Sequence, residues 1–177
     1  MGELLTRAET IEKLLDLYTR QYNIDRDAAG VPYLAARCDY FEYNQQYVIS
    51  RKAELWSANR EEFLYLFDVP HLTEEIYRQC EAWANQDGSG RMKIGPGHMS
   101  SDITAVFVCD GCDDYALAAL KKSRIHKSFH FSFHGWMDYR AVLLLPNKES
   151  VETNGAGKRE VKFMKKVLYS KKRKGEN

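Results

Sequence analysis

Three histidines spaced four residues apart, in the stretch HKSFHFSFH, are the residues whose types and spacing first suggest chemistry. On a helix, His126, His130 and His134 would share one face and could hold a metal ion. The phenylalanines that alternate with them favour a strand, on which four residues span roughly 13 Å, too far for one ion to bridge two histidines. We therefore predict no shared metal site, but an open histidine face with Trp136 that could bind a ligand. The opposite face would place three rings in the core: Phe129, Phe131 and Phe133.

Two cysteines separated by two residues form a second candidate site. Cys109 and Cys112 fall where a buried strand is expected to end and a helix to begin, a position at which helix amides can lower a thiol pKa. The neighbouring residues are acidic, which raises a thiol pKa instead, and no second CxxC pair completes a zinc site. We predict a structural turn with Cys109 buried, and a redox or zinc site is the alternative.

Strand carboxylates offer a third kind of chemistry. The expected order of helix, three strands, helix and strand resembles that of restriction-endonuclease-like nucleases, in which acids and a lysine hold Mg²⁺. The third strand reads REEFLYLF, with no lysine two residues after an acid. Because this lysine is missing, we predict a binding or regulatory protein that needs no cofactor. A metal-dependent nuclease or phosphodiesterase is the enzyme alternative, and no catalytic residue is assigned. The acids available on these strands are Asp39, Glu42, Glu54, Glu61 and Glu62.

Charge is distributed unevenly along the chain. Residues 1–120 carry 11 Lys and Arg against 20 Asp and Glu, whereas residues 121–177 carry 15 against 5. The basic third can contact a nucleic acid or an acidic protein partner, which could be a second copy in a homodimer; alternatively, the two parts neutralise each other within the fold. At the start of the last helix, Asn154 and Gly157 either hold an anion or form a capped turn. The cations expected to contact a polyanion are Lys158, Arg159, Lys162, Lys165 and Lys166.

Hydrophobic periodicity predicts a single α+β domain over residues 1–170, with one mixed or antiparallel sheet of about six strands packed with about four helices. The first three strands would form an antiparallel meander, and the last two a hairpin that turns near Gly135, or one bent strand with a bulge there. Expected strands are 34–42, 46–56, 61–69, 102–109, 126–134 and 138–145, and expected helices are 6–22, 73–85, 113–122 and 157–169. The longest irregular stretch is 86–101, and 171–177 would be a basic, disordered tail.

Length and composition are typical of one soluble domain. The chain has 177 residues, of which 44% are hydrophobic, enough for a continuous core. No apolar run approaches the roughly 20 residues of a membrane span, and MGELLTRAET contains no apolar signal segment. Four cysteines in a chain of this length suit reduced thiols. We expect a cytoplasmic protein without membrane contact.

Five short motifs, taken together, resemble an uncharacterised family of small bacterial proteins of Firmicutes type. They are VPHLTEE at 69–75, CDGCDD at 109–114, HKSF at 126–129, HGWMDYR at 134–140 and TNGAGK at 153–158. The resemblance covers most of the chain. It implies a bacterial, cytoplasmic, single-domain protein, and it supplies no catalytic residues, because no activity is assigned to the family.

Overall fold

The computed structural model describes residues 4–44 and 58–169. The predicted strand at 46–56 and the predicted tail at 171–177 lie outside the described residues. The described elements, in chain order, are α1 (Arg7–Tyr18), β1 (Asn23–Asp25), β2 (Leu34–Asn44), β3 (Ala58–Leu72), α2 (Glu74–Arg91), β4 (His98–Cys112), α3 (Asp114–Lys122), β5 (His126–Ser128), β6 (Trp136–Leu145), the 3-10 helix η1 (Pro146–Lys148), β7 (Ser150–Thr153) and α4 (Lys158–Tyr169).

The seven described strands form one mixed sheet in the order β1-β2-β3-β4-β6-β5, and β7 also pairs with β6. β3, β4 and β6 are parallel, whereas the other four strands pair antiparallel with their neighbours. A parallel pair needs a crossover connection, which α2 provides between β3 and β4, and α3 with β5 between β4 and β6. The predicted α+β class, with a mixed sheet and four helices, is confirmed.

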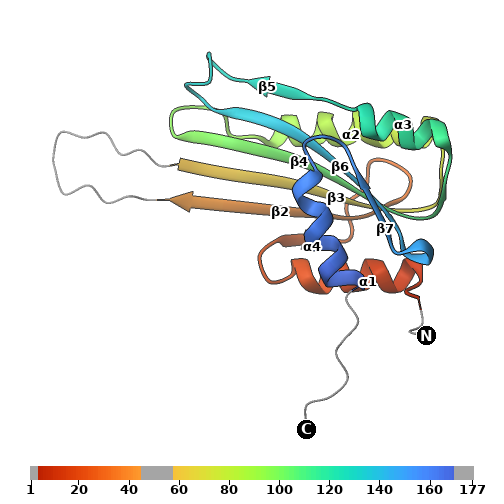
Figure 1. Cartoon of the computed structure of the whole chain (residues 1–177). Coiled ribbons are helices and arrows are strands. Elements are labelled where there is room, and N and C mark those ends of the chain that lie inside the picture. Colours follow the sequence, from red (N-terminus) through yellow and green to blue (C-terminus); the bar gives the residue numbers. More distant parts are fainter. Residues whose placement is uncertain (1–3, 45–57, 170–177) are drawn as a thin grey trace, which may run out of the picture.

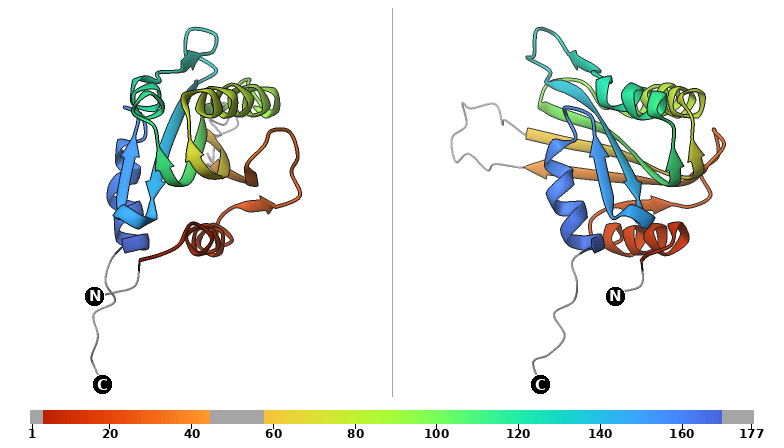
Figure 2. Two further views of the ribbon diagram at one scale, coloured as in Figure 1. Left: turned by 90° about the vertical axis from the view of Figure 1, so that its right-hand side faces the viewer. Right: turned by 45° about the vertical axis from the view of Figure 1, so that its right-hand side comes forward.

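Helices cover both faces of the sheet (Figure 1). α2 and α3 lie on one face and α1 and α4 on the other, and the turned views of Figure 2 show the sheet between the two layers. Side chains alternate between the two faces along a strand, and helices cover both faces. The central strands are therefore apolar on both faces. In β3, for example, Phe63 and Tyr65 belong to the core under α2 and α3, whereas Leu64 and Leu66 belong to the core under α1 and α4.

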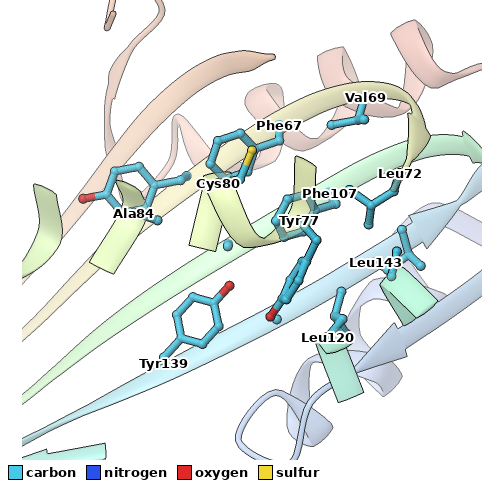
Figure 3. Packing of buried hydrophobic residues seen from close by; sticks show 14 of the residues in the cluster. Phe67, Val69, Leu72, Tyr77, Cys80, Ala84, Phe107, Leu120, Tyr139 and Leu143 are labelled. Carbon is cyan, nitrogen blue, oxygen red and sulfur yellow. The ribbon is translucent and has the colours of Figure 1, made fainter. Parts of the chain in front are cut away.

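Aromatic rings fill the core under α2 and α3 (Figure 3). The ring of Tyr77 in α2 lies 5.5 Å from that of Phe107 in β4, and Phe107 stacks on Phe67 of β3 at 5.0 Å. Leu120 of α3 and Tyr139 of β6 complete this part of the core. All five side chains are fully buried. Burial of one large apolar side chain contributes about 1.5–3 kcal/mol, so this cluster fixes α2 and α3 on the sheet.

The buried side chain of Asn154 fills a gap at the edge of β6. β5 pairs with the first three residues of β6 and β7 with its last four, which leaves the backbone between them without a strand partner on the side away from β4. Asn154 Oδ1 accepts hydrogen bonds from the N–H groups of Ala141 (3.1 Å) and Gly157 (3.0 Å), and its Nδ2 donates to the carbonyls of Tyr139 (2.9 Å) and Ser123 (3.2 Å). These four bonds saturate the amide. Asn154 therefore forms the capped turn rather than an anion site.

The first helix forms as its sequence predicts, although it is shorter. Thr6 accepts a hydrogen bond from the Glu9 N–H, and the Glu9 carboxylate accepts one from the Thr6 N–H, so a capping box starts the helix. The helix ends at Tyr18 instead of Tyr22. The turn that follows carries Tyr22 to the edge of the sheet, where its hydroxyl donates to Glu62 of β3 over 2.6 Å.

The predicted meander is wrong in its strand order. β2 pairs directly with β3 over ten residue pairs, from Leu34 opposite Phe67 to Asn44 opposite Ala58, so the expected first and third strands are neighbours in the sheet. The next neighbour of β3 is β4, in parallel, not an antiparallel strand. Alternation identifies a strand, but it does not reveal which strand is its partner.

Residues 86–91 belong to α2 rather than to the predicted irregular stretch, and β4 begins at His98 rather than at 102. One glycine of this stretch, Gly88, serves helix packing. A Cβ atom at Gly88 would lie 2.8 Å from Ile103 Cδ1, so only glycine allows the helix to approach the sheet this closely. Arg91, the last residue of the helix, donates to Asp39 of β2 (2.6 Å) and to the Tyr65 hydroxyl (3.0 Å).

Candidate functional site

The predicted histidine face does not exist as a strand. β5 contains only residues His126–Ser128, and the segment 129–135 turns back to β6. Three consecutive residues of this turn, His130, Phe131 and Ser132, have positive φ angles of 48°, 52° and 69°. Phe131 and Phe133 are 92% and 80% exposed, so the prediction that they anchor the core is wrong, and only Phe129 packs against it. The predicted hairpin is confirmed, but its first strand is short because Trp136, the first residue of β6, already pairs with Ser128.

The four predicted residues of this face fall into separate groups. His126 lies on β5, where its Nδ1 is 2.7 Å from the Asp138 carboxylate. His130 and His134 lie in the turn with their rings stacked at 4.9 Å, and Trp136 begins β6. Within the described residues, no three His, Cys, Asp or Glu side chains are grouped so that they could hold a metal ion.

The two cysteines of the CDGC motif lie at the end of β4, directly before α3. Cys109 is buried, as predicted, and both thiols are free. Burial raises the pKa of Cys109 well above its usual value, and burial with the nearby Asp113 raises that of Cys112. Both shifts keep the thiols protonated, which disfavours nucleophilic chemistry and metal binding.

The predicted polyanion-binding residues lie on α4, with four exposed lysines and the exposed Arg159. None of the five forms an ion pair with an acid in the described part of the chain. Among the described residues, Arg140 is the only residue of 121–177 that forms ion pairs with residues 1–120. Its partners there are Asp102 and Glu62. The two halves of the charge distribution therefore neutralise each other only locally.

A groove between α1, α4 and the sheet is a site that the sequence did not reveal. It consists of two adjoining cavities of about 420 and 290 Å³ that share Gln21, Tyr22, Glu62 and Glu160. The larger cavity has an apolar wall that includes Leu17, Leu64, Phe163 and Met164. The smaller one is lined by polar side chains that include Tyr40, Asp102 and Arg140. Together the cavities have the size and the mixed lining of a small-molecule site.

Strand register brings the polar residues of the groove together. Residues directly opposite one another on five neighbouring strands form one row across the sheet, because each pairs with the next in register. The row consists of Tyr40, Glu62, Asp102, Asp138 and His126. The sequence separates these residues by up to 98 positions, so no local motif connects them.

Arg140 lies at the centre of the carboxylates and is only 6% exposed. Its Nη2 donates to Asp102 over 2.7 Å, and its Nη1 lies 3.8 Å from both Glu62 and Glu160. Its Nε is buried and has no hydrogen-bond partner in the described structure. Glu62 also accepts from the hydroxyls of Tyr22 (2.6 Å) and Thr104 (2.7 Å). Three carboxylates therefore share one buried guanidinium.

Two of the carboxylates near Arg140, those of Asp102 and Glu160, have raised pKa values. Burial raises the pKa of Asp102 to about 6; Arg140 opposes this shift and the nearby Glu62 adds to it. The pKa of Glu160 is also raised, first by burial and then by Glu62. One buried guanidinium thus lies among three carboxylates, and Arg60 and Arg159 lie at the exposed rim. The inner part of the groove has an excess of negative charge.

Tyrosine rings line the groove beside these acids. Tyr18 and Tyr22 lie 5.2 Å apart between ring centroids, and Tyr22 and Tyr40 lie 5.6 Å apart. The hydroxyl of Tyr18 is buried without a partner among the described groups. Electron-rich ring faces next to carboxylates are the surroundings in which proteins bind organic cations.

Sequence reasoning identified Glu62 as a strand carboxylate but missed Asp102, Arg140, Thr104 and Glu160 as members of one site. Arg140 in the otherwise apolar stretch MDYRAVLLL was the available signal, because a charge within a buried strand needs a partner. No local pattern could have identified that partner, since Asp102 is 38 residues away.

A scan of protein-family models matches residues 6–166 to a domain of unknown function, DUF8052. The chain belongs to the DUF8052 family. The match covers every residue that lines the groove, so the groove lies within the family domain. No curated protein and no solved structure shows significant similarity to this DUF8052 chain. In its described part, no helix is long and apolar enough to cross a membrane.

Proposed function

We propose that this protein binds a small organic ammonium compound in the groove between α1 and α4. The observation that carries the proposal is the cluster of Glu62, Asp102 and Glu160 around a single buried arginine, Arg140. A cation bound beside this cluster would offset its excess negative charge and lower the raised carboxyl pKa values. Such a ligand gains most beside charges that are shielded from water, and Asp102 and Arg140 are both largely buried.

The rest of the groove supports a ligand with an apolar body. The rings of Tyr22 and Tyr40 lie beside the acids and can contact an ammonium group through their faces. The adjoining apolar cavity, with Leu17, Leu64 and Met164 in its wall, can receive a hydrocarbon or aromatic group. The hydroxyl of Tyr18 remains available to donate to an oxygen atom of the ligand.

Three probes of one size and different charge test the proposal. The thermal unfolding midpoint would be measured at pH 7.5 with 2-phenylethylamine, the neutral 2-phenylethanol and the anionic phenylacetate, each at about 10 mM. A dissociation constant of about 1 mM would stabilise the fold by about 1.4 kcal/mol, a shift of a few degrees. We expect the amine alone to raise the midpoint. A rise with phenylacetate and none with the amine would exclude the cation site.

A second function is supported by the unpaired cations of α4. We propose that the basic face formed by Lys158, Arg159, Lys162, Lys165 and Lys166 contacts a polyanion or an acidic partner, which could be a second copy of the chain. Exposure and the lack of ion pairs to these five cations in the described structure favour this contact. Binding to heparin or to a nucleic acid should weaken steeply as salt rises; salt-independent retention would contradict it. A cytoplasmic location fits the four free thiols.

A further inference from the structure

The turn between β5 and β6 exposes two aromatic rings on a strained backbone. The left-handed conformation costs roughly 1–2 kcal/mol for each residue other than glycine, and His130, Phe131 and Ser132 adopt it in succession. Phe131 and Phe133 nevertheless point into solvent, where they contribute no core packing. Strain of this kind at an exposed site indicates a functional constraint.

The base of the turn is firmly anchored. The Phe129 N–H donates to the carbonyl of Gly135 (2.9 Å), and the His134 N–H donates to the carbonyl of Phe129 (3.2 Å). The buried His98 donates from Nδ1 to the His134 carbonyl. Gly135 has a φ of 77° and leaves no room for a side chain, because a Cβ atom would lie 2.2 Å from the Met99 carbonyl oxygen. The backbone that carries the two rings is therefore anchored at both ends of the turn.

The surroundings of the turn are positively charged. No acidic residue occurs between positions 115 and 137. Lys122, Arg124 and Lys127 are exposed and form no ion pair within the described chain, and Lys127 lies on β5, directly before the turn. Asp138 is the nearest acid in sequence, and His126 contacts it. Figure 1 shows β5 and the turn on the side of the sheet away from α4, so this surface is distinct from the basic face of α4.

We infer that the turn at 129–135, together with the cations of β5 and the segment before it, binds single-stranded nucleic acid. Bases would stack on Phe131 and Phe133, and phosphates would contact Lys127 and Arg124. Exposed aromatic faces flanked by cations are the combination by which proteins bind single strands without reading sequence. A membrane surface fits less well, because insertion of the rings would also bury the imidazole of His130, which lies 6.4 and 6.0 Å from them between ring centroids. This surface requires neither the groove nor α4.

Fluorescence anisotropy with a labelled oligonucleotide of about 12 nucleotides tests the inference, since that length is within the usual site size. Phe131→Ala with Phe133→Ala should weaken binding about tenfold or more, because each stacked base contributes about 1–3 kcal/mol. Tyr115→Ala is the matched control, since Tyr115 is a 79% exposed ring on α3 outside the turn, and it should leave affinity unchanged. Lys127→Ala should reduce the salt slope by about 0.7.

Three results would overturn the inference. The first is no binding of the single strand at low salt, and the second is equal affinity of the double phenylalanine variant and the Tyr115→Ala control. The third is binding of anionic phospholipid vesicles that depends on both phenylalanines, without binding of the oligonucleotide. A variant with alanine at Lys158, Lys162, Lys165 and Lys166 separates the two basic surfaces: loss of binding in this variant alone would assign the contact to α4 instead.

Discussion

Arg140 Nη2 donates to the Asp102 carboxylate over 2.7 Å between neighbouring parallel strands, at a point where both residues are almost excluded from solvent. A single buried pair of this kind can balance its charges. Here Glu62 and Glu160 approach the same guanidinium, so the site contains more acidic than basic groups. The proposed ammonium site is a direct consequence of this arrangement.

The stability of the protein should fall as Asp102 ionises. Its folded pKa of about 6 lies above the ordinary value of 3.8, so the folded state binds the proton more tightly, and this stabilisation is complete below about pH 4. It is lost between about pH 4 and 6, by up to about 3 kcal/mol at roughly 1.4 kcal/mol per pH unit. Urea unfolding of the wild type and Asp102→Asn across this range measures the difference. Parallel pH curves for the two proteins would show that the folded pKa of Asp102 is not raised.

Loss of Arg140 should be severe at neutral pH and milder in acid. Arg140→Gln leaves three carboxylates facing one another in a buried site, which costs about 3–5 kcal/mol at pH 7.5. At pH 5 the loss should shrink, because Asp102 and Glu160, whose pKa values are raised, take up protons. Chemical denaturation at both pH values measures this, with Arg26→Gln as control, since Arg26 pairs with Glu12 at the exposed surface. An equal loss at both pH values would contradict the shared-cation arrangement.

Binding of an amine should release protons near pH 6. A cation beside Asp102 lowers the pKa of this carboxyl, so the complex binds fewer protons than the free protein. Titration calorimetry of 2-phenylethylamine in two buffers of different ionisation enthalpy gives the number of protons released. We expect release at pH 6 and almost none at pH 8, where Asp102 is already ionised. Proton uptake at pH 6 would contradict the proposed position of the ligand.

Asn154 should be a strong determinant of stability. Asn154→Ala removes four buried hydrogen bonds and leaves backbone groups of β6 unsatisfied, which should cost about 2–4 kcal/mol. Asn147→Ala is the control, because the Asn147 side chain is exposed and makes one bond, to the Asp110 carbonyl at 2.8 Å. The control should lose less than about 1 kcal/mol. Equal losses in denaturant unfolding would show that the edge of β6 does not depend on this amide.

Two glycines of α2 should respond in opposite directions to the same substitution. Gly88→Ala places a methyl group 2.8 Å from Ile103 and should destabilise the fold by about 1–3 kcal/mol. Gly90 has open space at its Cβ position, so Gly90→Ala should stabilise by about 0.5–1 kcal/mol through helix propensity. Thermal unfolding of both variants tests whether α2 continues to Arg91. Stabilisation by both substitutions would contradict the close contact at Gly88.

Local sequence signals predicted helices and strands better than they predicted which strands pair with each other. The capping box of Thr6 and Glu9 started α1 as expected, because both partners lie within one turn. The alternation at His126–His134 was misleading, because a strand needs a partner, and β6 provides one for only three residues. The groove could not be predicted, since its row of polar residues depends on register between strands far apart in sequence. Glycine at position 88 suggested a loop although it serves close helix packing.

The central claim is most directly tested by titrating 2-phenylethylamine into the wild type, Glu160→Gln and Glu75→Gln at pH 7.5 by calorimetry. Glu160 lies in the groove 3.8 Å from Arg140, whereas Glu75 is an exposed acid on α2, on the opposite face of the sheet. Both substitutions remove one negative charge, so only position distinguishes them. We predict that Glu160→Gln weakens binding about tenfold, about 1.4 kcal/mol, and that Glu75→Gln leaves it unchanged. Equal affinity in all three proteins would contradict the claim.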